Sequence, residues 1–171
     1  MASDSDLYTL AARVGAAVHA AGRRLATAES CTAGWIAKAL TDVPGSSQWF
    51  ECGYVTYSDA AKVRDLDVSA RTLAEFGAVS EQTAREMAMG ALRVPKVSVA
   101  LAVTGIAGPD GGTPEKPVGT VWLCAAARHD RGIETIAEVK HFAGDRAAVR
   151  RCSVQHALEL LLRLDLRTGA A

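Results

Sequence analysis

Hydrophobic and polar positions along the chain follow two periods, one typical of helices and the other typical of strands. Apolar residues recur at helical spacing over residues 7–18, which predicts a helix that ends near Gly22. One apolar run begins at Leu25, and another extends over residues 97–103 with almost no polar interruption. Such runs predict strands that are buried on both faces of a sheet. The chain therefore begins with a helix that is followed by a buried strand.

The same reasoning predicts the remaining elements and the fold class. Helices are expected over residues 35–42, 58–66, 72–76, 80–92 and 145–162, and strands over 47–57, 120–127 and 133–142. Alternating helices and strands that are followed by sequential strands predict an α/β protein, a three-layer α/β/α sandwich around a mixed sheet. The two ends, up to residue 5 and from residue 164 onward, are expected to fray.

Composition fits one domain formed by residues 1–171. Hydrophobic residues make up 49% of the 171 positions, so the chain can bury a sizeable core. The 19 basic and 19 acidic residues cancel, which argues against nucleic acid or a membrane as a partner. The four cysteines form no CxxC pair and are interpreted as thiols, so no metal site is expected. No signal sequence is recognised, and a cytoplasmic location is expected.

The stretch 28–34 carries the first candidate chemistry. A strand turns here into a helix, and the unpaired N–H groups and dipole at a helix start favour negative charge. Ser30 and Cys31 are both candidate nucleophiles at this turn. Ser30 ranks first, because a cysteine among small residues is more often an inert, packed thiol. The alternative interpretation of Ser30 is a simple helix cap.

A serine nucleophile needs a base, and Lys62 is the better candidate for it. The four histidines accompany no motif, so a Ser-His-Asp triad is not supported. Lys62 lies in the first turns of the helix that follows residues 47–57, and burial of a lysine lowers its pKa enough to leave some neutral amine. The alternative is an ordinary surface charge.

Four further positions suggest a binding site. Tyr57 and Thr104 offer hydroxyl groups at strand ends, although each also fits an ordinary strand residue. The loop that begins at Gly105 is rich in Gly and Pro and permits close approach of a ligand, and a structural turn explains it equally well. Arg146 lies at the start of the last helix, where the dipole does not favour a cation, so we expect it to hold an anion.

These stretches occur together and in a fixed order. The segments are AESCTAG at 28–34, VTYSDAAK at 55–62, GAVS at 77–80, AVTGIAGP at 102–109, GGT at 111–113 and KPVGTV at 116–121. Taken together they resemble the CinA C-terminal domain family over about residues 7–164. The resemblance implies a domain of that family in its stand-alone form.

The resemblance also implies an activity and its residues. The family's characterised enzyme is nicotinamide-nucleotide amidase, which hydrolyses nicotinamide mononucleotide to nicotinate mononucleotide and ammonia in pyridine nucleotide salvage. Carried over by position, Ser30 is the nucleophile, Lys62 is its base and Tyr57 is a third catalytic residue. The substrate-binding positions expected from the resemblance are Cys31, Thr32, Ala33, Gly34, Thr104, Gly105 and Arg146. No cofactor or metal is implied, a small nucleotide is the expected partner, and a homo-oligomer, a dimer, is expected.

Two positions depart from the family pattern. The family often has Gly where this chain has Ala33, and Asn where it has Asp59. Ala33 still carries an N–H group for an oxyanion, whereas Asp59 adds a charge that is expected to raise the pKa of Lys62. Two other functions stay open, namely a non-catalytic oligomeric interaction module and an amidase for another small carboxamide. Ammonia release from nicotinamide mononucleotide tests the first alternative, and a panel of carboxamide substrates tests the second.

Overall fold

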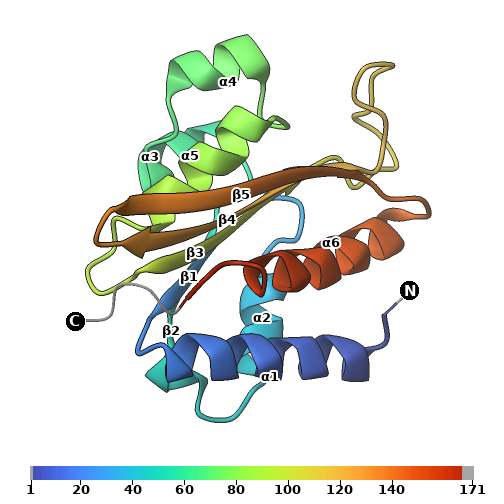
Figure 1. Cartoon of the computed structure of the whole chain (residues 1–171). Coiled ribbons are helices and arrows are strands. Elements are labelled where there is room, and N and C mark those ends of the chain that lie inside the picture. The colour runs from blue at the N-terminus through green and yellow to red at the C-terminus, as the bar shows by residue number, and fades with distance from the viewer. Residues whose placement is uncertain (1, 167–171) are drawn as a thin grey trace.

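The elements of the fold lie in three layers, as a computed structural model that describes residues 2–166 shows (Figure 1). The helices are α1 (Asp4–Ala20), α2 (Trp35–Thr41), α3 (Asp59–Leu66), α4 (Ala70–Phe76), α5 (Glu81–Ala91) and α6 (Arg146–Leu161), with a 3-10 turn η1 at Ser46–Gln48. The strands are β1 (Leu25–Glu29), β2 (Phe50–Val55), β3 (Val99–Gly105), β4 (Thr120–His129) and β5 (Gly132–His141). Helices α3 and α5 lie on one side of the sheet, with α4 packed on the outside of α5, and α1, α2 and α6 lie on the other side. The predicted three-layer α/β/α sandwich is confirmed.

The sheet is mixed, with the strand order β2-β1-β3-β4-β5. Strand β1 is parallel to both β2 and β3, whereas β4 is antiparallel to β3 and to β5. The carboxyl ends of β1, β2 and β3 therefore lie at the same edge of the sheet. In α/β proteins this edge is where ligands usually bind.

The two faces of the sheet differ in the size of their side chains. On β3, Leu101 and Val103 belong to the core beneath α1, α2 and α6, whereas Ala100 and Ala102 belong to the core beneath α5. Alanines on the second face let α5 approach the sheet closely. A similar closeness holds between helices, because a Cβ added at Gly90 of α5 would lie 2.1 Å from the carbonyl oxygen of Leu66 at the end of α3.

Several predicted boundaries are wrong, each for a local reason. The first helix begins at Asp4 instead of fraying, because Ser3 and Asp6 form a capping box. The strand expected from residue 47 begins at Phe50, after η1. Residues 164–166 do not fray, since Leu164 and Leu166 are buried, while residues 167–171 lie outside the described part. Among the described helices, none is both long and apolar enough to cross a membrane.

Candidate active site

Ser30 and Lys62 meet at the carboxyl edge of the parallel strands. The Ser30 N–H group donates to Val103 O at 2.9 Å and the Thr56 N–H group donates to Glu29 O at 2.9 Å, so the ladders of the sheet hold both strand ends. The chain after β2 enters α3, capped by the Ser58 side chain, and Lys62 returns toward Ser30. Its Nζ atom lies 3.2 Å from Ser30 Oγ. The structure thus brings together the predicted nucleophile and base.

The amine of Lys62 is buried, with 1% of the residue exposed. Burial lowers the pKa of Lys62, and the negative charge of Asp59, whose Oδ1 lies 3.9 Å away, opposes that shift. The Nζ atom donates to the carbonyl oxygens of Thr56 at 3.0 Å and Tyr57 at 3.2 Å. A neutral amine has two N–H groups and one lone pair, so these carbonyls leave the lone pair facing Ser30 Oγ.

The helix start after Ser30 is already occupied by an anion from the chain itself. Glu29, at the end of β1, is fully buried, and its carboxylate accepts from the N–H groups of Ile36 at 3.0 Å and Ala37 at 2.8 Å. It also accepts from Thr32 Oγ1 at 2.7 Å. The turn is therefore held rigidly, but α2 does not offer its dipole to a substrate. Sequence reasoning missed Glu29, and its position just before a helix was the available signal.

Three predicted substrate-binding residues lie away from Ser30's cavity. The Thr32 side chain is buried against Glu29. Ala33 and Gly34 border another hollow, shared with Trp35 and Lys38, and both have positive φ angles of 50° and 88°. The Ala33 N–H group, which the sequence left available for an oxyanion, donates instead to Ser30 O at 3.1 Å. Within residues 2–166, no backbone carbonyl accepts from the N–H groups of Cys31 or Thr32.

The cavity beside Ser30 has a volume of about 190 Å³. Its walls are formed by Ser30, Cys31, Tyr57, Asp59, Lys62, Ala78, Val79, Thr104, Gly105, Ala107 and Arg146. They come from the carboxyl ends of β1, β2 and β3 and the residues that follow these strands, from α3, from the loop after α4, and from the start of α6. Seven of the ten predicted site residues line this cavity, namely Ser30, Cys31, Tyr57, Lys62, Thr104, Gly105 and Arg146.

Tyr57 and Arg146 form one rim of the cavity. Arg146 Nη2 donates to the Tyr57 hydroxyl oxygen at 3.1 Å, and its Nη1 donates to Gly108 O at 2.8 Å. Tyr57 is 59% exposed, and among the described residues its hydroxyl contacts Arg146 and neither Ser30 nor Lys62. Thr104 is buried and its hydroxyl donates to Ala78 O at 2.8 Å, which ties β3 to the opposite wall.

Cys31 differs sharply from a reactive cysteine. Burial raises the pKa of its thiol to about 12, and the nearby Glu29 charge acts in the same direction. A thiol with this pKa carries almost no thiolate at neutral pH. The geometry therefore favours Ser30 over Cys31 as the nucleophile.

Arg150 of α6 braces the Ser30 turn. Its Nε donates to Cys31 O at 3.1 Å and its Nη2 donates to Thr32 O at 2.9 Å, while its guanidinium lies over the Trp35 ring. Glu29 thus holds the turn through the Thr32 hydroxyl and backbone N–H groups, and Arg150 holds it through two backbone carbonyl oxygens. Arg151 forms an ion pair with Asp4 at the start of α1. These partners are distant along the chain, so no local pattern in the sequence indicates them.

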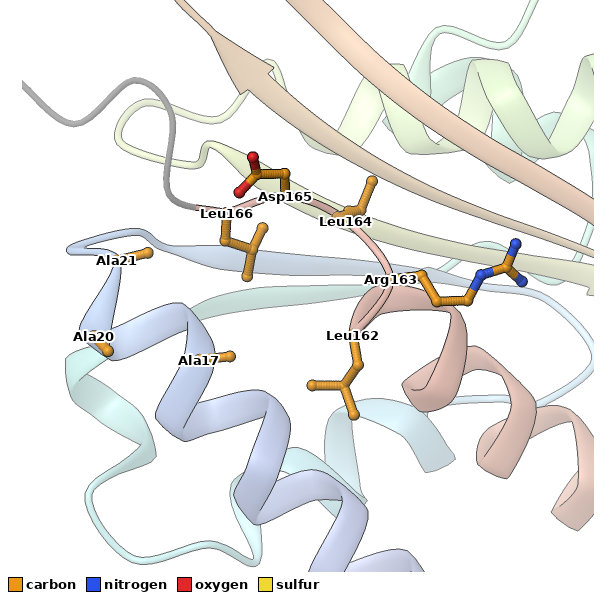
Figure 2. Close-up of a pocket in the computed structure, with 8 residues that line it drawn as sticks. All are labelled: Ala17, Ala20, Ala21, Leu162, Arg163, Leu164, Asp165 and Leu166. Atoms are coloured by element: carbon orange, nitrogen blue, oxygen red, sulfur yellow. The ribbon is translucent and has the colours of Figure 1, made fainter.

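A larger cavity, of about 810 Å³, lies elsewhere (Figure 2). It lies between the end of α1 and the segment after α6 and is lined by Ala17, Ala20, Ala21, Leu162, Arg163, Leu164, Asp165 and Leu166. These residues include no nucleophile. Over residues 2–166, no group of three or more His, Cys, Asp or Glu side chains is placed to hold a metal ion. The smaller cavity is therefore the candidate active site.

Together, the fold and the site define an α/β/α protein with a buried serine–lysine pair at the carboxyl edge of its parallel strands, an arrangement suited to acyl transfer. The CinA C-terminal domain model matches residues 7–164, and the chain belongs to that family. The predicted resemblance is confirmed.

Relatives and solved structures agree with this assignment. The chain is 50% identical to the nicotinamide-nucleotide amidohydrolase PncC of Escherichia coli (strain K12) over 159 residues, which cover 93% of this chain and 94% of the relative. It is 49% identical to the protein of the same name from Pseudomonas putida, covering 92% and 96% of the two chains. The crystal structure of the competence/damage inducible protein CihA from Agrobacterium tumefaciens matches with a TM-score of 0.87 at 43% identity, covering 95% and 96%.

Proposed function

We propose that this protein is a nicotinamide-nucleotide amidase. It hydrolyses the carboxamide of nicotinamide mononucleotide to nicotinate mononucleotide and ammonia, and so acts in pyridine nucleotide salvage. The observation that carries the proposal is the Ser30 Oγ to Lys62 Nζ distance of 3.2 Å at the wall of a cavity. The names of relatives at about 50% identity supply the substrate.

In the acylation step, neutral Lys62 takes the proton of the Ser30 hydroxyl as Oγ attacks the amide carbon. A C–O bond forms and the carbonyl oxygen becomes an oxyanion, for which the N–H groups of Cys31 and Thr32 are the available donors. Lys62 then gives its proton to the leaving nitrogen, the C–N bond breaks, and ammonia departs. The product of this step is an ester between Ser30 and the nicotinoyl group.

In the second step, water attacks that ester and the carboxylic acid product leaves. Lys62 is again the base, because it accepts a proton from the water and returns one to Ser30 Oγ as the C–O bond breaks. Tyr57 was expected to be a third catalytic residue, and we instead assign it a positioning role. Its carbonyl orients Lys62 and its hydroxyl holds Arg146 at the rim.

The cavity size sets how the nucleotide binds. A volume of about 190 Å³ is below the usual range for ligand pockets, so it takes the carboxamide and ring and leaves the ribose phosphate outside. Arg146 lies at the rim and is exposed, and we assign the phosphate to it. Thr104 and Gly105 bound the ring side of the cavity.

The first experiment measures ammonia release from nicotinamide mononucleotide by the purified chain and by Ser30→Ala. Loss of the nucleophile is expected to lower kcat by at least about a thousandfold. Ser5→Ala, on the exposed side of α1, is the matched serine control and is expected to keep full activity. Wild-type activity in Ser30→Ala would refute Ser30 as the nucleophile.

The alternatives are separated by the same assay. No ammonia from the folded wild-type chain, with any of a panel of small carboxamides, would favour a non-catalytic interaction module. Activity on another amide but not on the nucleotide would favour a different amidase. Both outcomes are read from the same purified protein.

Assembly and location form a smaller part of the proposal. We propose a homo-oligomer, a dimer, and light scattering after gel filtration measures its mass. The four cysteines are free thiols, in agreement with a reducing compartment, and we place the enzyme in the cytoplasm. A monomer at working concentration would refute the first statement.

A further inference from the structure

A carboxylate lies on the cavity wall although it opposes the proposed base. Asp59 is the first residue of α3, and the helix is already capped by Ser58, whose side chain accepts from the Ala61 N–H group at 3.1 Å. The Asp59 side chain is 61% exposed, and its Oδ1 lies 3.9 Å from Lys62 Nζ. Because its charge raises the pKa of Lys62, Asp59 disfavours the neutral amine on which the chemistry depends.

The cavity is polarised from one side to the other. Asp59 supplies a negative charge beside Lys62, and Arg146 supplies a positive charge at the rim formed with Tyr57. Lys62 lies between Asp59 and Ser30. Its Nζ atom is 3.9 Å from Asp59 Oδ1 and 3.2 Å from Ser30 Oγ. A ring whose carboxamide carbon lies against Ser30 therefore shares its cavity with Asp59. This charge distribution suits an amide that carries a positive ring and a negative tail.

The nucleotide of the proposed function has this charge distribution. Its ring nitrogen is bonded to ribose, so the ring is a pyridinium cation, and the nitrogen is meta to the carboxamide. We infer that Asp59 is a specificity-determining residue that recognises the positive charge of the ring and selects pyridinium amides over neutral amides. This inference rests on the proposed function. The positive charge of a bound ring also disfavours the protonated form of Lys62. The Asp59 carboxylate then pairs with the ring instead of with the Lys62 ammonium, and the amine of Lys62 is neutral.

The test compares two nucleotides that differ in ring charge. Oxidised nicotinamide mononucleotide has a cationic ring, and its reduced dihydropyridine form has the same carboxamide, ribose and phosphate on a neutral ring. Calorimetry measures the dissociation constants of both for Ser30→Ala, which prevents turnover, and for the same variant with Asp59→Asn added. Asparagine keeps the size of the side chain and removes its charge. Thermal unfolding confirms that each variant is folded.

The expected result is a change in selectivity. Asp59→Asn lowers the preference for the oxidised over the reduced nucleotide by about threefold to fivefold, as loss of one partly exposed ion pair predicts. Asp65→Asn, added instead, removes the same charge from the same helix outside the cavity and leaves the preference unchanged. If Asp59→Asn changes the affinities for the oxidised and the reduced nucleotide by the same factor, or changes neither affinity, the inference is overturned.

The ammonia assay and the binding measurements together distinguish failure of this inference from failure of the proposed function. Wild-type ammonia release with an unchanged affinity ratio in Asp59→Asn overturns only the role of Asp59. Absence of both ammonia release and nucleotide binding overturns the proposed function, and the inference with it.

Discussion

Lys62 shows how a single residue acquires its chemistry from its surroundings. Burial of the amine and two carbonyl acceptors decide its protonation and direction, and Asp59 opposes the effect of burial. Its partners lie within a few residues of the β2–α3 connection, apart from Ser30 itself. This local construction is the reason that the lysine could be nominated from sequence.

The pH dependence of activity follows from these charges. The base must be deprotonated, so kcat/KM is expected to rise with pH, with a midpoint below the ordinary pKa of lysine. Because the Asp59 charge raises the pKa of Lys62, Asp59→Asn is expected to move this midpoint to lower pH. A profile of kcat/KM against pH for both proteins measures the shift. Asp65→Asn is the control, and an upward shift in Asp59→Asn contradicts the prediction.

Ala33 carries a backbone conformation that suits glycine. Its φ is 50°, a left-handed value that a Cβ atom disfavours. We expect Ala33→Gly to stabilise the chain by about 1 kcal/mol, as measured by urea unfolding. Gly34 in the same turn has a φ of 88°, so Gly34→Ala is expected to act in the opposite direction. A loss of stability in Ala33→Gly would show that the turn is not strained.

At the residue scale, candidate site residues could be predicted from the sequence more readily than the residues that contact them. Ser30 and Lys62 were predictable because each sits next to the end of a strand and the start of a helix. The bracing role of Arg150 was not predictable, since its contact with Cys31 joins residues 119 positions apart. The capping box of Ser3 and Asp6, by contrast, has a visible spacing and was overlooked.

Helices α3 and α5 are the elements whose contact sets the position of Lys62. The Gly90 backbone touches the last turn of α3, the helix that carries the lysine. Hydrophobic periodicity predicted both helices, but it does not report how closely two helices approach. Likewise, the β propensity of Trp49 predicted a strand, whereas the residue packs in the core against Gly15 of α1.

Substitution of Gly90 tests this contact. A methyl group there would lie 2.1 Å from Leu66 O, so α3 has to move. We expect Gly90→Ala to lower the free energy of unfolding by about 1–3 kcal/mol and to reduce kcat as Lys62 shifts. Urea unfolding and the ammonia assay measure the two effects. Met89→Ala, exposed on the same helix, is expected to change stability by less than about 0.5 kcal/mol.

At the scale of the whole molecule, Arg23 joins distant parts of the chain. It is buried, and its guanidinium donates to Leu166 O at 2.9 Å and to Arg128 O at 2.7 Å. It thus connects the start of β1 to β4 and to the segment after α6. Buried carbonyl groups that lose such a donor are costly.

Arg23→Met is therefore expected to destabilise the chain by about 2–3 kcal/mol. The neighbouring Arg24 forms a partly exposed ion pair with Glu51, and Arg24→Met is expected to cost less than about 1 kcal/mol. Urea midpoints of the two variants give the comparison. Equal effects would show that Arg23 is not a structural link.

The layers of the molecule were predictable, whereas the strand order was not. Alternating elements indicate helices on both faces of a sheet, but a parallel pair such as β1 and β3 joins segments that no local pattern connects. The cavity shares this property, because its walls come from strand ends that only the topology brings together.

The chain distances within the site have a consequence for partial unfolding. The contact between Ser30 and Lys62 spans 32 positions, whereas the contact between Tyr57 and Arg146 that closes the rim spans 89. Opening the amino-terminal end of α6 away from the sheet would remove the rim while β1, β2 and α3 stay in place. Under mild denaturant, an intact serine–lysine pair would then outlast the rim to which we assign the nucleotide phosphate, and the enzyme would lose affinity before it loses reactivity.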